Sequence, residues 1–532
     1  IFEITYGEDD SITGCVLPSQ NSDVYNDLYI YKDNTYVMPD QTTPLNEVES
    51  LESMLDFYSL YVDENIEHMY SYAFSNANGL LNGFLGMANI SNAEYAFNDC
   101  TGMKYCYMPN ATGRQANNMF AYCTSLKRVL LPDTLTTLGE AAYRWCLNIE
   151  YFQTPYLGRD GGSMVTGKRY QETIGYHFST DERYTGSDTR YYNQHISRYC
   201  KYNQIYDNTG WQSARYVPLS FKLVVTQDTL IQYSSLAQMV ACLTEVYLSD
   251  KVTYIGESAF TRSADIKKIG VWDSANHCII EVKEGEARFS DKLNSIERLG
   301  LAGLHLIKDV VIPNSVNYIG FDAFMNTGLE KLVIPFVGVS RTPETYTYGN
   351  NGLNATLGWY FNCDHNWYYT RADLWGGTYV TFPINNEKIP LTDHYNPDQR
   401  VYVPSKLKTV IVTDTTTIAK DAFRNMSMIE TIILPFGLDS EADNELGMPD
   451  IYATGEVRFG QCAVTTIGDN AFDGTNLKEM YLPASLEEIG EYAFRNNKNL
   501  TKFVSNSAAI NKYMFYGCSK LSTVIMDYIT EI

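Results

Sequence analysis

The chain has 532 residues, of which 45% are hydrophobic, so it is long enough for several domains and apolar enough for a large core. Its 40 Lys and Arg residues against 63 Asp and Glu residues give a formal net charge of −23. This charge repels phosphates, so it argues against nucleic acid and anionic membrane surfaces as partners, although a need for solubility also explains it. The sequence contains no apolar run of membrane length and no signal peptide, so we expect no membrane insertion.

The N-terminal region, residues 1–65, precedes the repetitive part of the chain. We expect a helix here that caps the first repeat, because terminal units of a repeat array need covers; contact with another protein is the alternative. The first residue is Ile1 rather than Met, so either a leader has been removed or the sequence is part of a longer chain. The apolar side chains at helical spacing are Leu45, Val48, Leu51, Met54, Leu55 and Tyr58.

An aromatic residue, often in the dipeptide Ala-Phe, recurs along the rest of the chain, and we call it the marker. The first four markers are each 23 residues apart: Phe74, Phe97, Phe120 and Tyr143. The later markers are Phe260, Leu301, Phe324, Phe423, Phe472, Phe494 and Phe515, with Leu301 23 residues before Phe324. A fixed period of this size is typical of stacked repeats, in which each unit buries its apolar face only against its neighbours.

The residues around the marker repeat as well. An aliphatic residue, often followed by Gly, lies five positions before the marker, as at Ile467 and Ile489. The segment Leu126 to Pro132 alternates with period 2, which predicts a short strand that proline ends. The sequence therefore predicts an α/β repeat solenoid with one short parallel strand per coil of 22–23 residues and an irregular or short helical return through the marker segment.

Two coils read LKRVLLPDTLTTLGEAAYRWC, from Leu126, and LKEMYLPASLEEIGEYAFRNN, from Leu477. This pattern resembles the BspA-like (Treponema pallidum type) leucine-rich repeats, and the resemblance extends with interruptions from Ile66 to the C-terminus. It implies a leucine-rich-repeat superhelix and an elongated scaffold. It also implies a bacterial surface or secreted protein, often adhesive, with relatives in parasitic protists and phages. A repeat scaffold hosts many binding tasks, so the resemblance indicates fold more specifically than ligand.

The 11 cysteines are an odd number, so at least one is unpaired. Four of them, Cys100, Cys123, Cys146 and Cys518, lie three residues after a marker. Other coils have Ser, Thr, Met or Asn in this slot, which indicates a small buried residue rather than a bridge. We therefore expect free structural thiols.

The repeats divide the chain into segments. We expect repeats at 66–155, 215–338 and 401–532, separated by a first insertion at 156–214 and a second at 339–400, with a short insertion near 437–460. The two long insertions resemble each other: ETIGYHF and ATLGWYF follow their starts, and Tyr-Val-Pro recurs near their ends at Tyr216 and Tyr402. Insertions of this length are often functional.

The insertions are rich in aromatic residues; we interpret their recurring Leu-Gly-Tyr/Trp-x-Phe and Tyr-Val-Pro segments as structural and their variable middles as the part free to bind. The aromatic residues are the candidate ligand-binding residues, because aromatic rings stack on sugars or partner side chains; the alternative is a small packed core that holds each insertion on the solenoid. The candidates are Trp359, Tyr360, Trp367, Tyr368, Tyr369 and Trp375 in the second insertion and Tyr191, Tyr192 and Trp211 in the first.

No catalytic or metal-binding motif is recognisable, so we expect no enzyme activity, metal or cofactor. The first hypothesis is a non-enzymatic binding and adhesion protein at a bacterial surface, with a protein or glycan partner. The alternative is a structural or receptor-binding component of a phage virion or of an extracellular filament, for which self-association is expected.

Overall fold

The computed structural model describes residues 59–161, 173–178, 212–237, 239, 242–341, 353–361, 400–437, 457–505 and 510–526, together with the strands at 3–6, 12–16, 27–30, 36–37, 199–206 and 377–381. These residues form two compact units. Unit 1 comprises 1–252 and 262–282, and unit 2 comprises 253–261 and 283–532. The helix expected around Leu45 to Tyr58 lies outside the described residues, and the next four residues, Ser59–Val62, form a strand.

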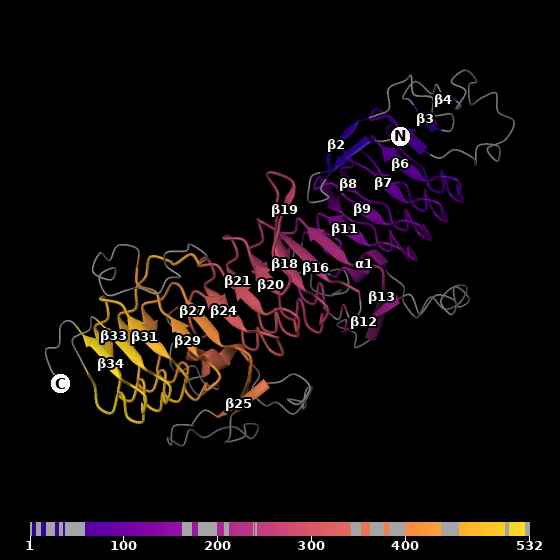
Figure 1. Ribbon diagram of the computed structural model, residues 1–532. Coiled ribbons are helices and arrows are strands. Elements are labelled where there is room, and N and C mark those ends of the chain that lie inside the picture. The colour runs from indigo at the N-terminus through magenta and orange to yellow at the C-terminus, as the bar shows by residue number, and fades with distance from the viewer. Residues whose placement is uncertain are drawn as a thin grey trace. The chain divides into compact units, whose positions relative to one another are not determined.

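Unit 1 is built on a ladder of short strands that lie side by side as successive rungs (Figure 1). All rungs are parallel except β4, which pairs antiparallel with β3. In spatial order they are β4 (Tyr36–Val37), β3 (Asp27–Ile30), β5 (Ser59–Val62), β6 (Asn82–Leu85), β7 (Tyr105–Tyr107), β9 (Arg128–Leu130), β11 (Tyr151–Thr154), β14 (Leu223–Thr226), β16 (Glu245–Ser249) and β18 (Lys268–Asp273).

Unit 2 repeats this architecture. Its parallel rungs are β20 (Glu286–Arg288), β22 (Asp309–Val311), β24 (Lys331–Ile334), β27 (Thr409–Val412) and β29 (Thr431–Ile433), and then β31 (Glu479–Leu482), β33 (Lys502–Ser505) and β34 (Thr523–Met526). Shorter parallel sheets run through a second side of the coils: β17 (Tyr254–Ile255), β21 (Ser295–Ile296) and β23 (Tyr318–Ile319), and β28 (Thr417–Ile418), β30 (Thr466–Ile467) and β32 (Glu488–Ile489).

The remaining elements lie outside the ladders or pair with one of their strands. In unit 1 they are the hairpin β1 (Glu3–Tyr6) and β2 (Ile12–Val16), the pair β8 (Gly113–Arg114) and β10 (Leu135–Thr137), strand β15 (Leu230–Ile231), and β19 (Cys278–Ile280), which pairs antiparallel with β18. An antiparallel pair lies at the end of each long insertion: β12 (Tyr199–Tyr206) with β13 (Gln212–Pro218), and β25 (Gly377–Thr381) with β26 (Arg400–Pro404). The second strand of each pair runs past the end expected for the insertion, at residue 214 or 400. The recurrent Tyr-Val-Pro ends β13 and β26, so the resemblance between the insertions extends to their backbones.

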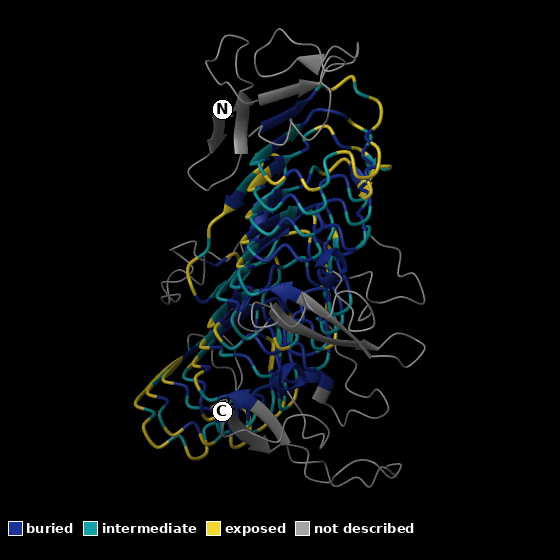
Figure 2. Cartoon of the chain, turned by 90° about the vertical axis from the view of Figure 1, so that its right-hand side faces the viewer, coloured by how far each residue is buried: buried dark blue, intermediate teal, exposed yellow. Residues whose placement is uncertain are grey.

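The predicted ladders of apolar residues form the core. In register across β7 and β9, Cys106 faces Val129, which are 23 residues apart. The markers stack on one another, with ring centroids 5.3 Å apart for Phe97 and Phe120 and 5.0 Å apart for Phe472 and Phe494. All of these residues are buried. Figure 2 shows buried and exposed segments alternating along the coils. The coil period and its burial pattern are thereby confirmed.

The helical part of the fold prediction is wrong. In the described residues the returns are turns, and the helical elements are only α1 (Gly175–Phe178) and the 3₁₀ turns η6 (Leu353–Ala355) and η7 (Leu357–Tyr360). The architecture is a β-solenoid with almost no helix. The reason lies two residues before and two residues after the marker, where the backbone is left-handed, as at Tyr95 (φ 56°) and Asp99 (φ 61°) around Phe97. A left-handed residue ends a right-handed helix.

Hydrogen bonds between coils compensate for this backbone strain. The amides of Phe97 and Asp99 donate to the carbonyls of Met119 and Ala121 in the next coil, at 2.9 and 2.8 Å. The intervening amide of Asn98 donates within its own coil to Tyr95, at 3.0 Å. Every second amide of the turn segment therefore bonds to the next coil. Neighbouring turn segments are joined in this way much as neighbouring strands of a sheet are joined.

The glycine that follows the aliphatic residue has a steric role. A Cβ on Gly139 would lie 2.1 Å from the carbonyl oxygen of Ala116 in the preceding coil, and a Cβ on Gly490 would lie 2.3 Å from the amide nitrogen of Asp469. Both contacts are impossible without moving backbone. Glycine is therefore required here because the backbones of neighbouring coils approach too closely for a Cβ atom. Its conformational freedom in the tight corner is a separate effect.

The cysteines of the repeat slot are free thiols, as expected. The thiols of Cys123 and Cys146 donate to the carbonyl oxygens of Phe97 and Phe120, the markers of the preceding coils, at 3.1 and 3.0 Å. Ser263 makes the equivalent bond to Leu236. The slot therefore selects small donors that satisfy a buried carbonyl. Burial raises the pKa of the Cys123 thiol well above its usual range, so it stays protonated.

Candidate binding site

The described root of the second insertion contains two of the predicted ligand-binding residues. Trp359 and Tyr360 belong to η7, and both are buried. The indole Nε1 of Trp359 donates to the carbonyl of Ile319 at 2.7 Å, and the hydroxyl of Tyr360 donates to the carbonyl of Phe336 at 2.7 Å. For these two residues the geometry favours the alternative of a packed core.

The other predicted residues lie outside the described residues, so their binding role stays a prediction. They are Trp367, Tyr368, Tyr369, Trp375, Tyr191, Tyr192 and Trp211.

The roots of both insertions replace an ordinary marker segment. The amide of Phe324 donates to the carbonyl of Tyr360, and the amide of Tyr143 donates to the carbonyl of His177 in α1, both at 3.0 Å. His177 is fully buried and its Nε2 lies 3.1 Å from the carbonyl oxygen of Leu157. Burial lowers the pKa of His177 to about 4, so the ring is neutral at pH 7 and acts as a structural donor.

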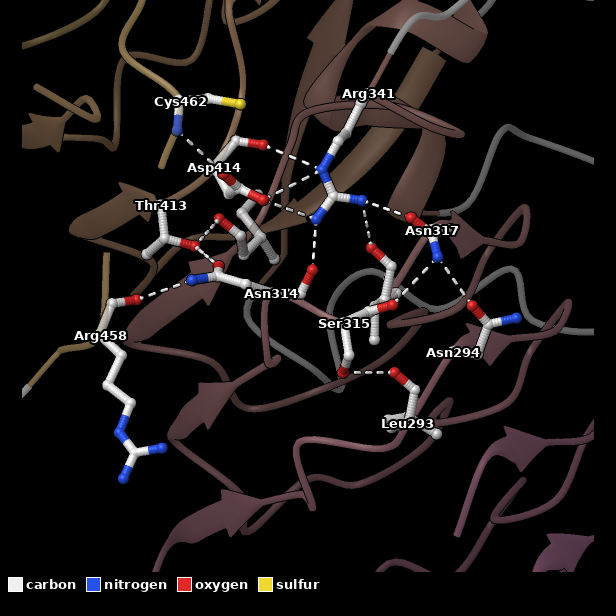
Figure 3. A network of polar contacts seen from close by, with 12 residues as sticks. Leu293, Asn294, Asn314, Ser315, Asn317, Arg341, Thr413, Asp414, Arg458 and Cys462 are labelled. Atoms are coloured by element: carbon white, nitrogen blue, oxygen red, sulfur yellow. Dashed lines mark hydrogen bonds and ion pairs between the residues drawn. The ribbon is translucent and has the colours of Figure 1, made fainter. Parts of the chain in front are cut away.

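A polar cluster, which we call the Arg341 clamp, fixes the start of the second insertion (Figure 3). The guanidinium of Arg341 donates to the Asp414 carboxylate from Nη2 at 2.9 Å and from Nε at 3.2 Å. It also donates to the carbonyls of Asn314 and Val316 and to the side chain of Asn317. One arginine thereby joins the corner after β22, the corner after β27 and the insertion.

The first insertion has a different arrangement at the equivalent place. Asp228 lies 186 residues before Asp414, the same offset that relates Tyr216 to Tyr402. Asp228 is buried, and its carboxylate accepts from the amides of Leu157 and Leu230 at 3.4 and 3.2 Å. Burial raises the pKa of Asp228 to about 7.

The most exposed aromatic side chains of unit 1 in the described part lie at the turn before Phe74. Tyr70 is 71% exposed and Tyr72 is 58% exposed. Tyr72 occupies the left-handed position two residues before the marker, and its ring stacks on Tyr95 of the next coil, with centroids 5.0 Å apart and planes 3° apart. We call Tyr70 and Tyr72 the tyrosine pair. It presents aromatic area on a rigid base, because the next coil already packs one of its rings.

Polar residues flank the tyrosine pair in its own coil and in the next one. The hydroxyl of Ser71 donates to the carbonyl of Asn92 at 3.2 Å, and His68 Nδ1 lies 3.3 Å from Asn89 Nδ2. Glu94, next to Tyr95, is exposed. Aromatic faces beside amides, hydroxyls and a carboxylate suit a ligand with both apolar surface and hydroxyl groups.

The sequence analysis did not predict this pair, because it relied on the recurring apolar residues that form the buried core. The signal was present: tyrosine stands two residues before the marker at Tyr72, Tyr95, Tyr492 and Tyr513. In unit 2 the last two stack with centroids 5.2 Å apart, and Tyr513 is 52% exposed. Here Lys512 Nζ lies 5.5 Å from the Tyr513 ring centroid, so a cation already lies over this ring.

A family model for the BspA type leucine rich repeat region matches residues 49–158, 229–353 and 455–532, with six copies. These segments cover more than half of the chain. The chain belongs to the BspA-type leucine-rich-repeat family. The segments left unmatched contain most of the first insertion and of the second, as expected of insertions into a BspA-type array.

Several solved leucine-rich-repeat structures are similar to this BspA-type chain. A leucine-rich repeat protein from Bacteroides ovatus is 16% identical, with a TM-score of 0.30, over 90% of this chain and 88% of that chain. A leucine rich cell surface protein from Faecalibacterium prausnitzii is 11% identical, with a TM-score of 0.20, over 88% and 79%. The T. pallidum leucine rich repeat protein is 11% identical, with a TM-score of 0.18, over 50% and 73%. Among curated proteins, none matches this chain.

Two kinds of feature are absent from the described ranges of this BspA-type chain. No three or more His, Cys, Asp and Glu side chains gather there in a way that could hold a metal ion. No helix within those same ranges is long and apolar enough to cross a membrane. The surfaces available for contact with a partner are the tyrosine pair and the two insertions, which are fixed to the solenoid at their roots.

Proposed function

We propose that this BspA-type protein is a non-enzymatic binding protein that recognises a protein or a glycan at a bacterial surface. The observation that carries the proposal is the tyrosine pair, Tyr70 and Tyr72. Exposed tyrosine rings suit contact, because each offers a large apolar face and a hydroxyl group, and the stacking of Tyr72 on Tyr95 leaves little side-chain entropy to lose on binding.

The insertions are the second contact region in this proposal. Their roots support it, because Trp359 and Tyr360 fill the core and the Arg341 clamp fixes the start of the second insertion. A rigid base lowers the entropy that a binding segment loses when it engages a partner. The aromatic residues beyond the roots, such as Trp367 and Tyr368, would then make the contacts.

The test is a binding screen with defined probes. The full chain is applied to a printed glycan array and to an array of purified extracellular proteins, next to the variant Tyr70→Ser/Tyr72→Ser. A matched control, Tyr105→Ser, removes a tyrosine that is 37% exposed on the strand face. We expect at least one probe to bind the wild type and the control, and to bind the double variant at least tenfold more weakly.

Two results would contradict the proposal. One is that no probe on either array binds the wild type. The other is that the double variant keeps full affinity and that a second variant, Trp367→Ser/Tyr368→Ser, also keeps it. If only the second variant loses affinity for the probe, the binding site lies in the second insertion and not at the tyrosine pair.

A further inference from the structure

A stripe of aliphatic side chains lies on the outward face of the unit 2 ladder. In register across β22, β24, β27 and β29, Val311 faces Val333, Val333 faces Ile411 and Ile411 faces Ile433. Each lies one residue after an inward ladder residue such as Leu332, so it points away from the core. We call these four residues the aliphatic stripe. Outward positions of a one-sided sheet are normally polar, so the stripe is unusual for a solvent-facing surface.

A short segment of the same chain covers the stripe. Val457 packs with Val333 and Ile411 in one buried cluster, against which Val311, Ile433 and Phe459 also pack. Arg458, between the two apolar residues, is exposed and pairs with Asp291 at 2.8 Å. We call residues 457–462 the strap. It presents an apolar, basic, apolar pattern to an aliphatic stripe that has a carboxylate at its side.

Individual hydrogen bonds, and not a ladder of strand pairing, hold the strap on the sheet. The amide of Gly460 donates to the carbonyl of Thr413 at 2.8 Å, Asn314 Nδ2 donates to the carbonyl of Arg458 at 3.1 Å, and the amide of Cys462 donates to Asp414 at 3.3 Å. Between Val457 and Cys462 the strap forms neither strand nor helix. The ion pair of Arg458 joins side chains that are 84% and 71% exposed, so it adds little.

The strap is also tied to the second insertion. Asp414 accepts from Cys462 and from Arg341, and Asn314 contacts Arg341 as well as Arg458 (Figure 3). Arg341 therefore holds the carboxylate of Asp414, which in turn accepts a hydrogen bond from the end of the strap.

We propose that the aliphatic stripe is a second binding surface, for a chain segment with two apolar residues that flank a basic one, and that the strap occupies it in cis as a displaceable cover. The occupant seen in the structure defines the partner: Val457 and Phe459 fill the stripe, and Asp291 receives the basic side chain between them. This proposal does not depend on the tyrosine pair. Segments of locally low stability are the ones that open while the rest of a protein stays folded.

A peptide complementation experiment tests the proposal. The variant Val457→Ser/Phe459→Ser of the full chain removes the apolar contacts of the strap and leaves the stripe intact. A labelled peptide TGEVRFGQ, residues 454–461, is titrated by fluorescence anisotropy. We expect it to bind the variant at least tenfold more tightly than the wild type, and a peptide with both apolar residues changed to serine to bind neither. A further Ile433→Ser exchange in the stripe weakens binding to the variant. Equal binding to variant and wild type, or no binding to a folded variant, overturns the proposal.

Hydrogen exchange on the wild type decides the matter if the variant does not fold. The amide of Gly460 in the strap is compared with the ladder amide of Thr409, which donates to Glu330. Exchange at least tenfold faster at Gly460 supports a cover that opens by itself. Equal rates mean that the strap opens only when unit 2 unfolds, which overturns the proposal.

Discussion

At the residue scale, each coil depends on two left-handed backbone positions around its marker. Around Phe324 these are Asp322 (φ 59°) and Asn326 (φ 54°). The −2 and +2 positions carry Asn, Asp or Gly in many coils, because these residues enter the left-handed region at the lowest cost.

Asn326 gives a test of this requirement. We expect Asn326→Val to destabilise unit 2 by about 1–2 kcal/mol, because a β-branched residue resists positive φ. We expect Asn326→Gly to change stability by less than about 1 kcal/mol, because glycine adopts this φ freely and occupies the equivalent position at Gly474. Urea unfolding of both variants checks this, and equal destabilisation by Val and Gly would contradict the assignment.

The marker itself gives a second residue-scale prediction. Phe472 is fully buried and stacks between Phe423 and Phe494, with centroids 5.5 and 5.0 Å away. Phe472→Ala should reduce the free energy of unfolding by about 3–5 kcal/mol, through lost burial and the cavity left behind. The control is Tyr516→Ala, which removes a ring that is 65% exposed. An unchanged melting temperature for Phe472→Ala would refute the stacked core.

At the element scale, the Arg341 clamp joins two corners of unit 2 to the second insertion. Arg341 and Asp414 are 24% and 15% exposed, so the ion pair is largely desolvated. We expect Arg341→Met to destabilise this region by about 2–4 kcal/mol, because it leaves a partly buried carboxylate and several carbonyls without their donor.

The first insertion supplies a matched control for the clamp. Arg159 pairs with its neighbour Asp160 at 2.8 Å, at 35% and 30% exposure. Arg159→Met should cost less than about 1 kcal/mol. Hydrogen exchange at Gly460 and Cys462 reads the clamp directly: faster exchange is expected in Arg341→Met and not in Arg159→Met. The same effect in both variants would mean that the clamp has no special role.

The repeating elements were predictable from the sequence, and the turn geometry was not. Regular recurrence of Phe74, Phe97 and Phe120 predicted the coil, because a stacked core requires identical spacing. Asn, Asp and Gly are frequent in the left-handed pairs, but Tyr, Trp, Leu, Arg, Ser and Ala also occupy them, so no single residue type identifies these positions in the sequence. The Arg341 clamp joins Asn314, Arg341 and Asp414, whose spacings follow no repeat, and the tyrosine pair stands outside the apolar pattern that carries the prediction.

At the scale of the whole molecule, buried carboxyl groups make stability depend on pH. Burial raises the pKa of Asp228 in unit 1 and of Asp322 in unit 2 to about 7 each, above the usual value near 4. Between about pH 4 and 7 the native state keeps protons that the unfolded state has lost. The free energy of unfolding therefore falls as pH rises, by up to about 1.4 kcal/mol per pH unit for each group.

Asp322→Asn tests this pH dependence. Oδ1 of Asp322 is buried without a hydrogen-bond partner, and Asn stands at the equivalent position in the coils of Phe120 and Phe472. We expect the variant to be more stable than the wild type at pH 8, and the gain to shrink as the pH falls to 4, where the wild-type carboxyl is protonated in the native state and about half protonated in the unfolded state. Urea unfolding from pH 4 to 8 measures this, and a gain that is independent of pH would refute ionisation as its cause.

The central claim is that this BspA-type protein binds its partner at a bacterial surface. The most direct test is immunogold labelling of intact cells of the source organism, with an antibody raised against residues 362–376 of the second insertion and with antigen-blocked antibody as the control. We expect the label on the cell envelope. Label confined to the cell interior would contradict the claim, and label on virus particles or filaments would contradict it in favour of a structural component.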